Sequence, residues 1–127
     1  TVSQNGSNKF WFADGALIGN TVTGVPLQYA NSNFTIGAIS PGYNGYGEAE
    51  WFNGSIANVQ LYNASLPPAE IQMLYKEGIG GAPIDLQNLV GWWPLNGNTN
   101  DYSGNGNNGK IFNESFSGAW LSTYPAP

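Results

Sequence analysis

Alternation of apolar and polar residues along short segments predicts a chain built mainly of strands. In Gly54–Tyr62, the apolar residues Ala57, Val59 and Leu61 alternate with polar ones, which is the period of a half-buried strand. Leu89–Leu95 is apolar on both faces and predicts a fully buried strand. The other expected strands are Lys9–Asp14, Asn33–Ile39, Asn108–Phe112 and Phe116–Leu121. The turns predicted between strands, rich in Gly and Asn, are Pro41–Gly47, Asn96–Asn100 and Gly104–Gly109.

One helix is predicted to interrupt the strands, over residues 68–77. Pro67 and Pro68 suit a first helical turn, and Glu70 lies near the positive end of the helix dipole. Residues 71, 74 and 75 form an apolar stripe at helical spacing, and Gly78 ends the pattern. The Gly-rich segment 78–83 that follows is expected to be a surface loop, with a hinge as the alternative.

Many short strands with Gly-rich turns favour an all-β fold, an antiparallel β-sandwich with one short helix. The length of 127 residues is that of one domain, residues 1–127. We expect residues 56–62 and 89–95 to be central, buried strands of this sandwich, because they are the most apolar strands of the chain. The helix is expected to pack across one end.

Two passages resemble a known family. Residues 52–78 contain a Phe-x-Gly-x-Ile strand, an apolar strand that ends in Tyr-Asn, and a Glu-Ile…Leu-Tyr…Gly helix. Residues 89–109 contain a Trp-x-Leu strand and an Asp-x-Ser-Gly-Asn-x-Asn-x-Gly loop. Both are similar to LamG-like jelly rolls of the concanavalin A-like lectin/glucanase superfamily, and Asn33–Ile39 resembles a further strand of that fold. The resemblance implies a concanavalin A-like jelly roll.

The order of the two passages is inverted relative to that family, because the stretch that closes the family's fold comes first. The chain could be a circular permutant, a slice of a tandem array, or a subunit whose strands complete its neighbour. The Trp-Trp-Pro-Leu-Asn-Gly sequence in the second passage resembles segments of archaeal surface and pilin-like proteins. The apolar tail 118–127 is expected to dock on its own domain or on a neighbouring subunit.

The charge composition excludes several classes of function. Charged residues make up 9% of the chain, and the formal net charge is −5. The basic residues Lys9, Lys76 and Lys110 are too few and too scattered to bind nucleic acid. The absence of His and Cys excludes zinc sites, thiol nucleophiles and Ser-His-Asp triads. The apolar runs are too short to span a membrane.

An extracellular location is expected from the composition. A chain without Cys, rich in Asn and Gly, suits the exterior of an archaeon or bacterium better than a disulfide-stapled ectodomain. The start at Thr1 suggests a mature product or an excised piece. Asn-x-Ser/Thr sequons, some of which composition alone would produce, give candidate N-glycosylation sites at Asn5, Asn33, Asn53, Asn63 and Asn113. Asn53 is the doubtful site, because its position beside Gly54 suits a buried turn.

Three groups of residues carry candidate chemistry. Glu48 and Glu50 would point the same way from a strand, and a retaining glycosidase needs two carboxyls that lie close together. A solvated acid pair is favoured, and no catalytic residue is assigned. A calcium site, the one cofactor site considered, is offered by the oxygens of Asp101, Ser103, Asn105 and Asn107. The alternative, which we favour, is a loop of Asx turns without a metal.

Aromatic residues beside amides offer a surface on which sugars can stack. The candidate carbohydrate-binding residues are Tyr43, Asn44, Tyr46 and Trp51. The favoured function is a non-enzymatic, extracellular, structural or adhesive module, such as a subunit of a cell-surface filament. The expected partners are copies of the same chain or surface glycans. The alternatives are a carbohydrate-binding module and, less favoured, a glycoside hydrolase.

Overall fold

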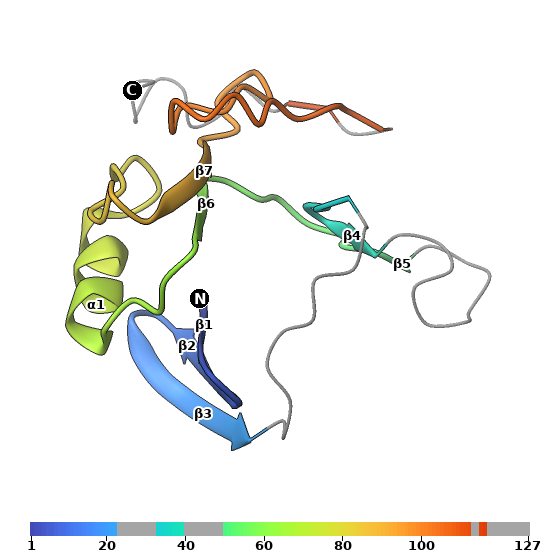
Figure 1. Cartoon of the computed structure of the whole chain (residues 1–127). Coiled ribbons are helices and arrows are strands. Elements are labelled where there is room, and N and C mark those ends of the chain that lie inside the picture. The colour runs from blue at the N-terminus through green and yellow to red at the C-terminus, as the bar shows by residue number, and fades with distance from the viewer. Residues whose placement is uncertain (23–32, 40–49, 113–114, 117–127) are drawn as a thin grey trace.

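The computed structural model describes residues 1–22, 33–39, 50–112 and 115–116. In these ranges the chain forms antiparallel sheets of short strands and one short helix (Figure 1). The sheets are β1-β2-β3, β4-β5 and β6-β7. The predicted all-β class with one helix is therefore confirmed at this level. The described strands do not form the two large facing sheets of a sandwich, so the jelly roll stays a prediction.

The N-terminal sheet is a meander of β1 (Val2–Asn5), β2 (Asn8–Ala13) and β3 (Ala16–Val22). The predicted strand Lys9–Asp14 is confirmed as β2, whereas β1 and β3 were not predicted. Asp14 and Gly15 join β2 to β3 with φ of 51° and 73°. Asp-Gly at two positive-φ positions is the signature of a tight hairpin turn, so this signal was present in the sequence.

Helix α1 spans Pro68–Glu77 and confirms the predicted helix. Pro67 is the N-cap, and its carbonyl accepts hydrogen bonds from the N–H groups of Glu70 and Ile71 at 3.0 and 3.2 Å. Gly78 ends the helix with φ of 75°, a backbone conformation that favours glycine. The start of β3 lies against α1, because a Cβ at Gly15 would lie only 2.9 Å from the Cβ of Tyr75.

The two strands predicted to be central, β6 (Val59–Tyr62) and β7 (Leu89–Trp93), pair with each other. Both are shorter than predicted. Asn58 and Leu95 have φ of 50° and 57°, and these left-handed residues stop the extended backbone of both strands at the Val59/Trp93 end of the pair. In β7, Leu89, Gly91 and Trp93 are buried, whereas Val90 and Trp92 are half-buried, so the strand is fully buried on one face and not on both as predicted. The side chains of β6 are half-buried.

Two other strand predictions were wrong in extent or in kind. In Asn33–Ile39 only β4 (Ala38–Ile39) is a strand, paired with β5 (Glu50–Trp51), and Gly37 with φ of 78° precedes it. Residues 108–112 form no strand, because Gly109 is fixed to Thr99 by hydrogen bonds within the loop. The predicted strand 116–121 and the predicted turn 41–47 lie outside the described residues, apart from Phe116.

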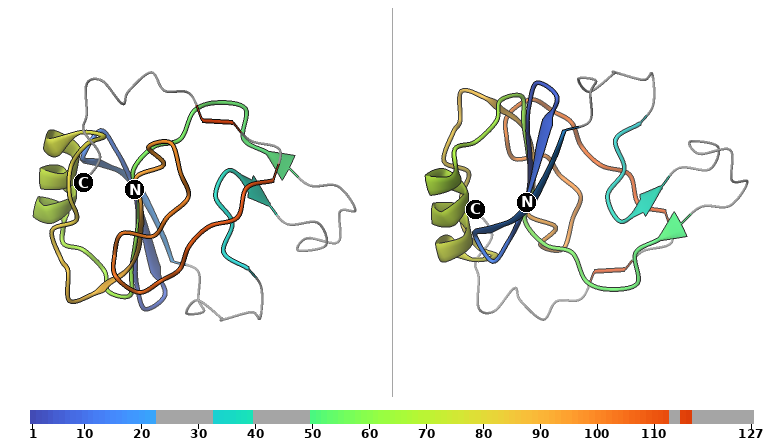
Figure 2. Two further views of the ribbon diagram at one scale, coloured as in Figure 1. Left: turned by 90° about the horizontal axis from the view of Figure 1, so that it is seen from above. Right: turned by 90° about the horizontal axis from the view of Figure 1, so that it is seen from below.

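The main core lies between the meander, α1 and β6. Phe12, Leu66 and Ile71 are buried there, and Phe10, Tyr62 and Leu74 pack against them. A second contact joins the segment before β4 to β7, where Phe34 stacks on Trp93 with ring centroids 5.5 Å apart. Figure 2 shows α1 and the β4-β5 ladder on opposite sides of the molecule, with the other elements between them.

Candidate functional site

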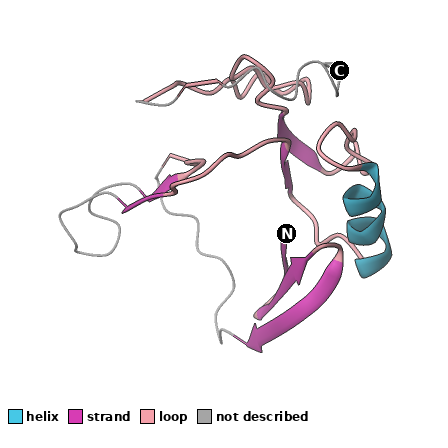
Figure 3. Ribbon diagram, turned by 180° about the vertical axis from the view of Figure 1, so that it is seen from behind, coloured by secondary structure: helices cyan, strands magenta, loops and turns pink. Residues whose placement is uncertain are grey.

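The loop after β7 is ordered around the carboxylate of Asp101. Its Oδ1 accepts hydrogen bonds from the backbone N–H groups of Trp92 and Ser103, both at 2.9 Å. Its Oδ2 accepts one from the N–H of Asn107 at 2.8 Å. One side chain thus ties β7 to both halves of its own loop. Figure 3 shows how much of the chain beyond β7 is loop.

The amide side chains of the same loop satisfy the carbonyls of β7. Asn105 Nδ2 donates to Leu89 O at 2.9 Å and to Val90 O at 3.1 Å, and Asn107 Nδ2 donates to Val90 O at 2.9 Å. The backbone N–H of Tyr102 donates to Trp92 O at 2.8 Å. These contacts lie on the edge of β7 that β6 leaves open, so the loop covers that edge in place of another strand.

The electrostatics of Asp101 follow from this arrangement. Burial raises the pKa of its carboxyl, but the hydrogen bonds from Trp92, Ser103 and Asn107 together outweigh burial. The net result is a pKa below the ordinary value of 3.8. Asp101 is therefore ionised at neutral pH with its oxygens bound to N–H donors.

The four residues predicted as a calcium site are thus brought together, but as a hydrogen-bonded loop. Asp101 is the one carboxylate among them, and three N–H groups already occupy it. Ser103 Oγ accepts from the N–H of Asn105, and the amides of Asn105 and Asn107 donate to β7. A calcium ion needs several convergent oxygens, so it would have to displace these donors. The donor set fits the loop of Asx turns better than a calcium cage. Calcium binding there stays a prediction that no observation tests.

A polar chain runs along β6 from Tyr62 to the edge of the Gly-rich segment 78–83. The Tyr62 hydroxyl donates to Gln60 Oε1 at 2.7 Å, and Gln60 Nε2 donates to Asn58 Oδ1 at 3.2 Å. Asn58 Oδ1 also accepts from the Trp92 indole at 2.8 Å, and Asn58 Nδ2 donates to Gly81 O at 2.9 Å. The segment predicted as a loop or hinge is therefore anchored to β6, and Pro83 within it is buried.

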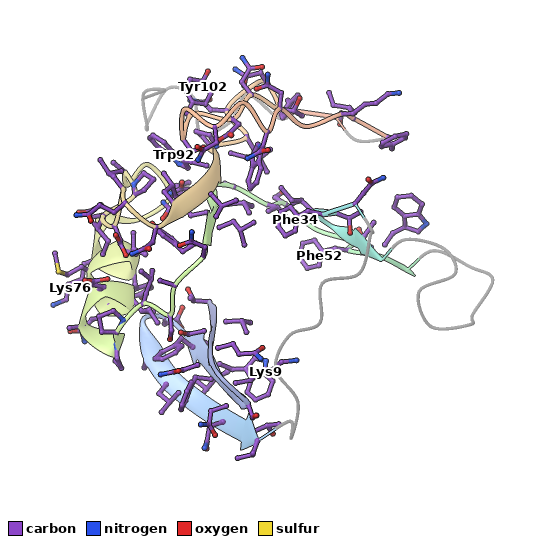
Figure 4. All side chains as sticks on the ribbon, viewed as in Figure 1. Lys9, Phe34, Phe52, Lys76, Trp92 and Tyr102 are labelled. Atoms are coloured by element: carbon purple, nitrogen blue, oxygen red, sulfur yellow. The ribbon has the colours of Figure 1, made fainter. Side chains whose placement is uncertain are left out.

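Of the predicted sugar-binding residues, Trp51 is the one described, and it is 59% exposed. Tyr43, Asn44 and Tyr46 lie outside the described residues, as does Glu48, and the side chain of Glu50 is not described. The structure adds two exposed aromatic residues that sequence reasoning missed, Phe34 and Phe52. Figure 4 shows both near the β4-β5 ladder. Phe34 lies within the Asn33 sequon and Phe52 directly precedes the Asn53 sequon. These segments were interpreted as glycan sites, and the aromatic residues themselves were not considered.

Four of the five predicted glycosylation sites are described. Asn5, Asn33, Asn53 and Asn63 are all exposed, and Asn113 lies outside the described residues. The concern that Asn53 occupies a buried turn was wrong, because residues 51–56 are all exposed.

Comparisons with known proteins give no match. No family model matches the chain, and neither a search of curated proteins nor one of solved structures finds a similar protein. The resemblance to LamG-like domains therefore stays a prediction. Within the described ranges there is no helix long and apolar enough to cross a membrane, and no cluster of three acidic metal ligands.

Proposed function

We propose that this chain is a structural module of an extracellular surface assembly, in which copies of the chain associate through a sheet edge. The proposal includes no catalytic role. It takes the LamG-like resemblance as the reason to expect a sandwich that a neighbouring copy completes. The observation that carries the proposal is the character of β3.

Strand β3 is an edge strand whose protection, in the described part of the chain, comes from a β-bulge and not from charge or Pro. Within the described part of the chain, β2 is its one strand neighbour. Natural sheet edges are commonly protected by Lys, Pro or a covering loop. The sequence of Ala16–Val22 contains no charged residue and no Pro, and Leu17, Ile18 and Val22 are 54%, 68% and 69% exposed. Strand β7, by contrast, has its second edge covered by the Asp101 loop.

The absence of charge on β3 favours a second copy as its partner. Two identical β3 edges can pair antiparallel about a twofold axis, because such an interface brings the same surface together from both subunits. No like charges from β3 itself oppose this pairing, although the chain as a whole carries a net charge of −5. A β-bulge at Trp11/Phe12, opposite Ile18, leaves the Ile18 side chain exposed for such a contact.

The experiment compares Ile18→Lys with Leu86→Lys. Both replace an apolar residue of nearly equal exposure, 68% and 69%, with the same charge, but Leu86 lies in a loop between α1 and β7. Sedimentation at increasing protein concentration measures self-association. We expect the wild type and Leu86→Lys to associate equally, and Ile18→Lys to associate about tenfold more weakly, the size of a like-charge penalty of about 1.4 kcal/mol. A wild type that stays monomeric throughout, or equal association of all three, would contradict the proposal.

A carbohydrate-binding module is the alternative, and the exposed Trp51 favours it. Trp51 and Phe52 are 59% and 60% exposed, and aromatic rings of this kind can stack on the apolar face of a sugar. Titration of soluble glycans against tryptophan fluorescence distinguishes the two functions. Binding that Trp51→Ala abolishes, in a chain that does not self-associate, would favour the alternative.

A further inference from the structure

Two sets of asparagines in the described part of the chain differ in what their side chains do. Those of the C-terminal loop hold the fold, as the amides of Asn105 and Asn107 do by donating to β7 carbonyls. Asn58 likewise binds Trp92 and Gly81. The sequon asparagines 5, 33, 53 and 63 are exposed, and none of their carboxamides bonds to another described residue. The fold therefore does not use the amide nitrogens of these four sequon asparagines.

In the Asn33 and Asn63 sequons, the Ser or Thr hydroxyl already makes a hydrogen bond within the fold. A sequon is recognised through its Ser or Thr as well as its Asn. Thr35 Oγ1 donates to Ala38 O at 2.6 Å, so the hydroxyl of the Asn33 sequon is engaged. The Ser65 hydroxyl of the Asn63 sequon shares a hydrogen bond of 2.6 Å with the buried Ser3.

The Asn5 sequon is constrained by its backbone. Asn5 ends β1 and pairs with Asn8 of β2, and Gly6 between them has φ of 59°. The three residues of this sequon therefore form a tight turn that cannot extend without breaking the end of the sheet.

The remaining sequon, Asn53-Gly54-Ser55, meets none of these restrictions. All three residues are exposed and lie between β5 and β6 in neither helix nor strand. Ser55 makes no side-chain hydrogen bond to the described residues. The Phe52 ring lies over Gly54, where a Cβ would be 2.7 Å from a ring carbon.

We propose that Asn53 is the principal N-glycan acceptor among the four sequons that the structure describes. The reaction requires a transferase and a lipid-linked sugar phosphate as co-reactant. The Asn53 Nδ2 forms a bond to the anomeric carbon of the sugar, and the bond from that carbon to the phosphate oxygen breaks. The nitrogen loses one proton to a base of the transferase, and the lipid phosphate leaves with the electron pair.

A glycan at Asn53 would stand beside Trp51 and Phe52 and away from the proposed β3 interface. Figure 1 shows β5 and the segment that follows it on a different side of the molecule from β3. A bulky, hydrated group there would solubilise an exposed aromatic surface. The inference shares with the proposed function the premise that the chain is exported, and it does not require self-association.

The first test secretes the chain from a yeast host and maps the glycopeptides by mass spectrometry, beside a co-secreted reporter glycoprotein. We expect the Asn53 peptide to have the highest occupancy among the peptides of Asn5, Asn33, Asn53 and Asn63. Asn53→Gln and Ser55→Ala should each remove one glycan mass, whereas Ser55→Thr should keep it. Asn20→Gln is the matched control, because Asn20 is exposed on β3 but lies in no sequon. An unmodified Asn53 beside a modified reporter would overturn the inference.

A second test separates the effect of the fold from that of the local sequence. Purified oligosaccharyltransferase with a lipid-linked sugar is offered the folded chain, or four short synthetic peptides that carry the sequons of Asn5, Asn33, Asn53 and Asn63. We expect Asn53 to be modified at least severalfold faster than the others in the folded chain, and this preference to shrink among the peptides. Equal rates in the folded chain would overturn the inference. Sedimentation of the same material reports self-association separately, so failure of one proposal does not imply failure of the other.

Discussion

At the scale of single residues, the Asp101 side chain joins β7 to the loop that follows it through three hydrogen bonds. The sequence predicted that its loop either binds calcium or forms Asx turns, and both readings placed the correct residues together. What could not be predicted is that Asn105 and Asn107 reach the carbonyls of Leu89 and Val90. That contact depends on which edge of β7 stays open, and strand order cannot be read from a local motif.

The charge of Asp101 should make stability depend on pH in the acid range. Its pKa is lowered in the folded state, so its contribution to stability is present above the unfolded value of about 4 and is lost as pH falls through the lower folded value. Urea unfolding from about pH 2 to about pH 7 measures this pH dependence, because that range brackets the ordinary carboxyl pKa. Asp101→Asn should destabilise the chain at neutral pH by about 1 kcal/mol and flatten the acid dependence. Asp14→Asn is the control, because Asp14 is exposed in a turn with φ of 51°, which Asn also adopts. Equal acid dependence in Asp101→Asn and the wild type would contradict this.

Tyr62 should affect stability at the opposite end of the pH scale. Burial is the largest cause that raises the pKa of its phenol above 10.0, and the charges of Asp85, Glu70 and Glu77 add to it. A backbone hydrogen bond from Ile84 opposes the increase. The folded state thus favours the neutral phenol, so this stability is complete below pH 10 and is lost as pH rises toward the folded pKa. Tyr62→Phe should lose the hydrogen bond to Gln60, and its free energy of unfolding should decrease less as pH rises. Urea midpoints from about pH 8 to about pH 11 measure this. Tyr75→Phe, on the exposed face of α1, serves as the control.

At the scale of elements, local signals predicted the helix well and the strands less well. The Pro67-Pro68 start, the apolar stripe and Gly78 all lie within residues 67–78, so α1 was predicted with its observed bounds. Strand β3 was missed because its pattern is irregular at the bulge opposite Trp11 and its apolar side chains are exposed. Residues 108–112 were predicted as a strand, yet the described chain places no neighbouring strand beside them.

The core under α1 gives the test at this scale. Ile71 is 2% exposed and packs with Phe12 and Leu66, so Ile71→Ala should leave a cavity and cost about 3 kcal/mol of unfolding free energy. Met73→Ala on the same helix is the control, because Met73 is 52% exposed, and its effect should be within about 0.5 kcal/mol. Chemical denaturation followed by circular dichroism measures both. If the two variants are equally stable, α1 does not cover the core described here.

At the scale of the whole molecule, the described chain exposes more large apolar side chains than it buries. The buried ones are Phe12, Leu66, Ile71, Leu89 and Trp93. Sheets of two or three strands are marginal without further packing. A chain that completes its sheets by association would gain stability only when copies meet, and its stability would therefore depend on protein concentration.

Thermal unfolding at several protein concentrations tests this final prediction. For a chain stabilised by association, each tenfold increase in concentration adds up to about 1.4 kcal/mol per binding event, so the unfolding temperature should rise with concentration. The Ile18→Lys chain, with a charge on β3, should unfold at a temperature that depends much less on concentration. Leu86→Lys should follow the wild type, because its charge lies outside the sheets. An unfolding temperature of the wild type that is independent of concentration would mean that the single chain accounts for its own stability. The exposed side chains of β3 would then be available for a different partner.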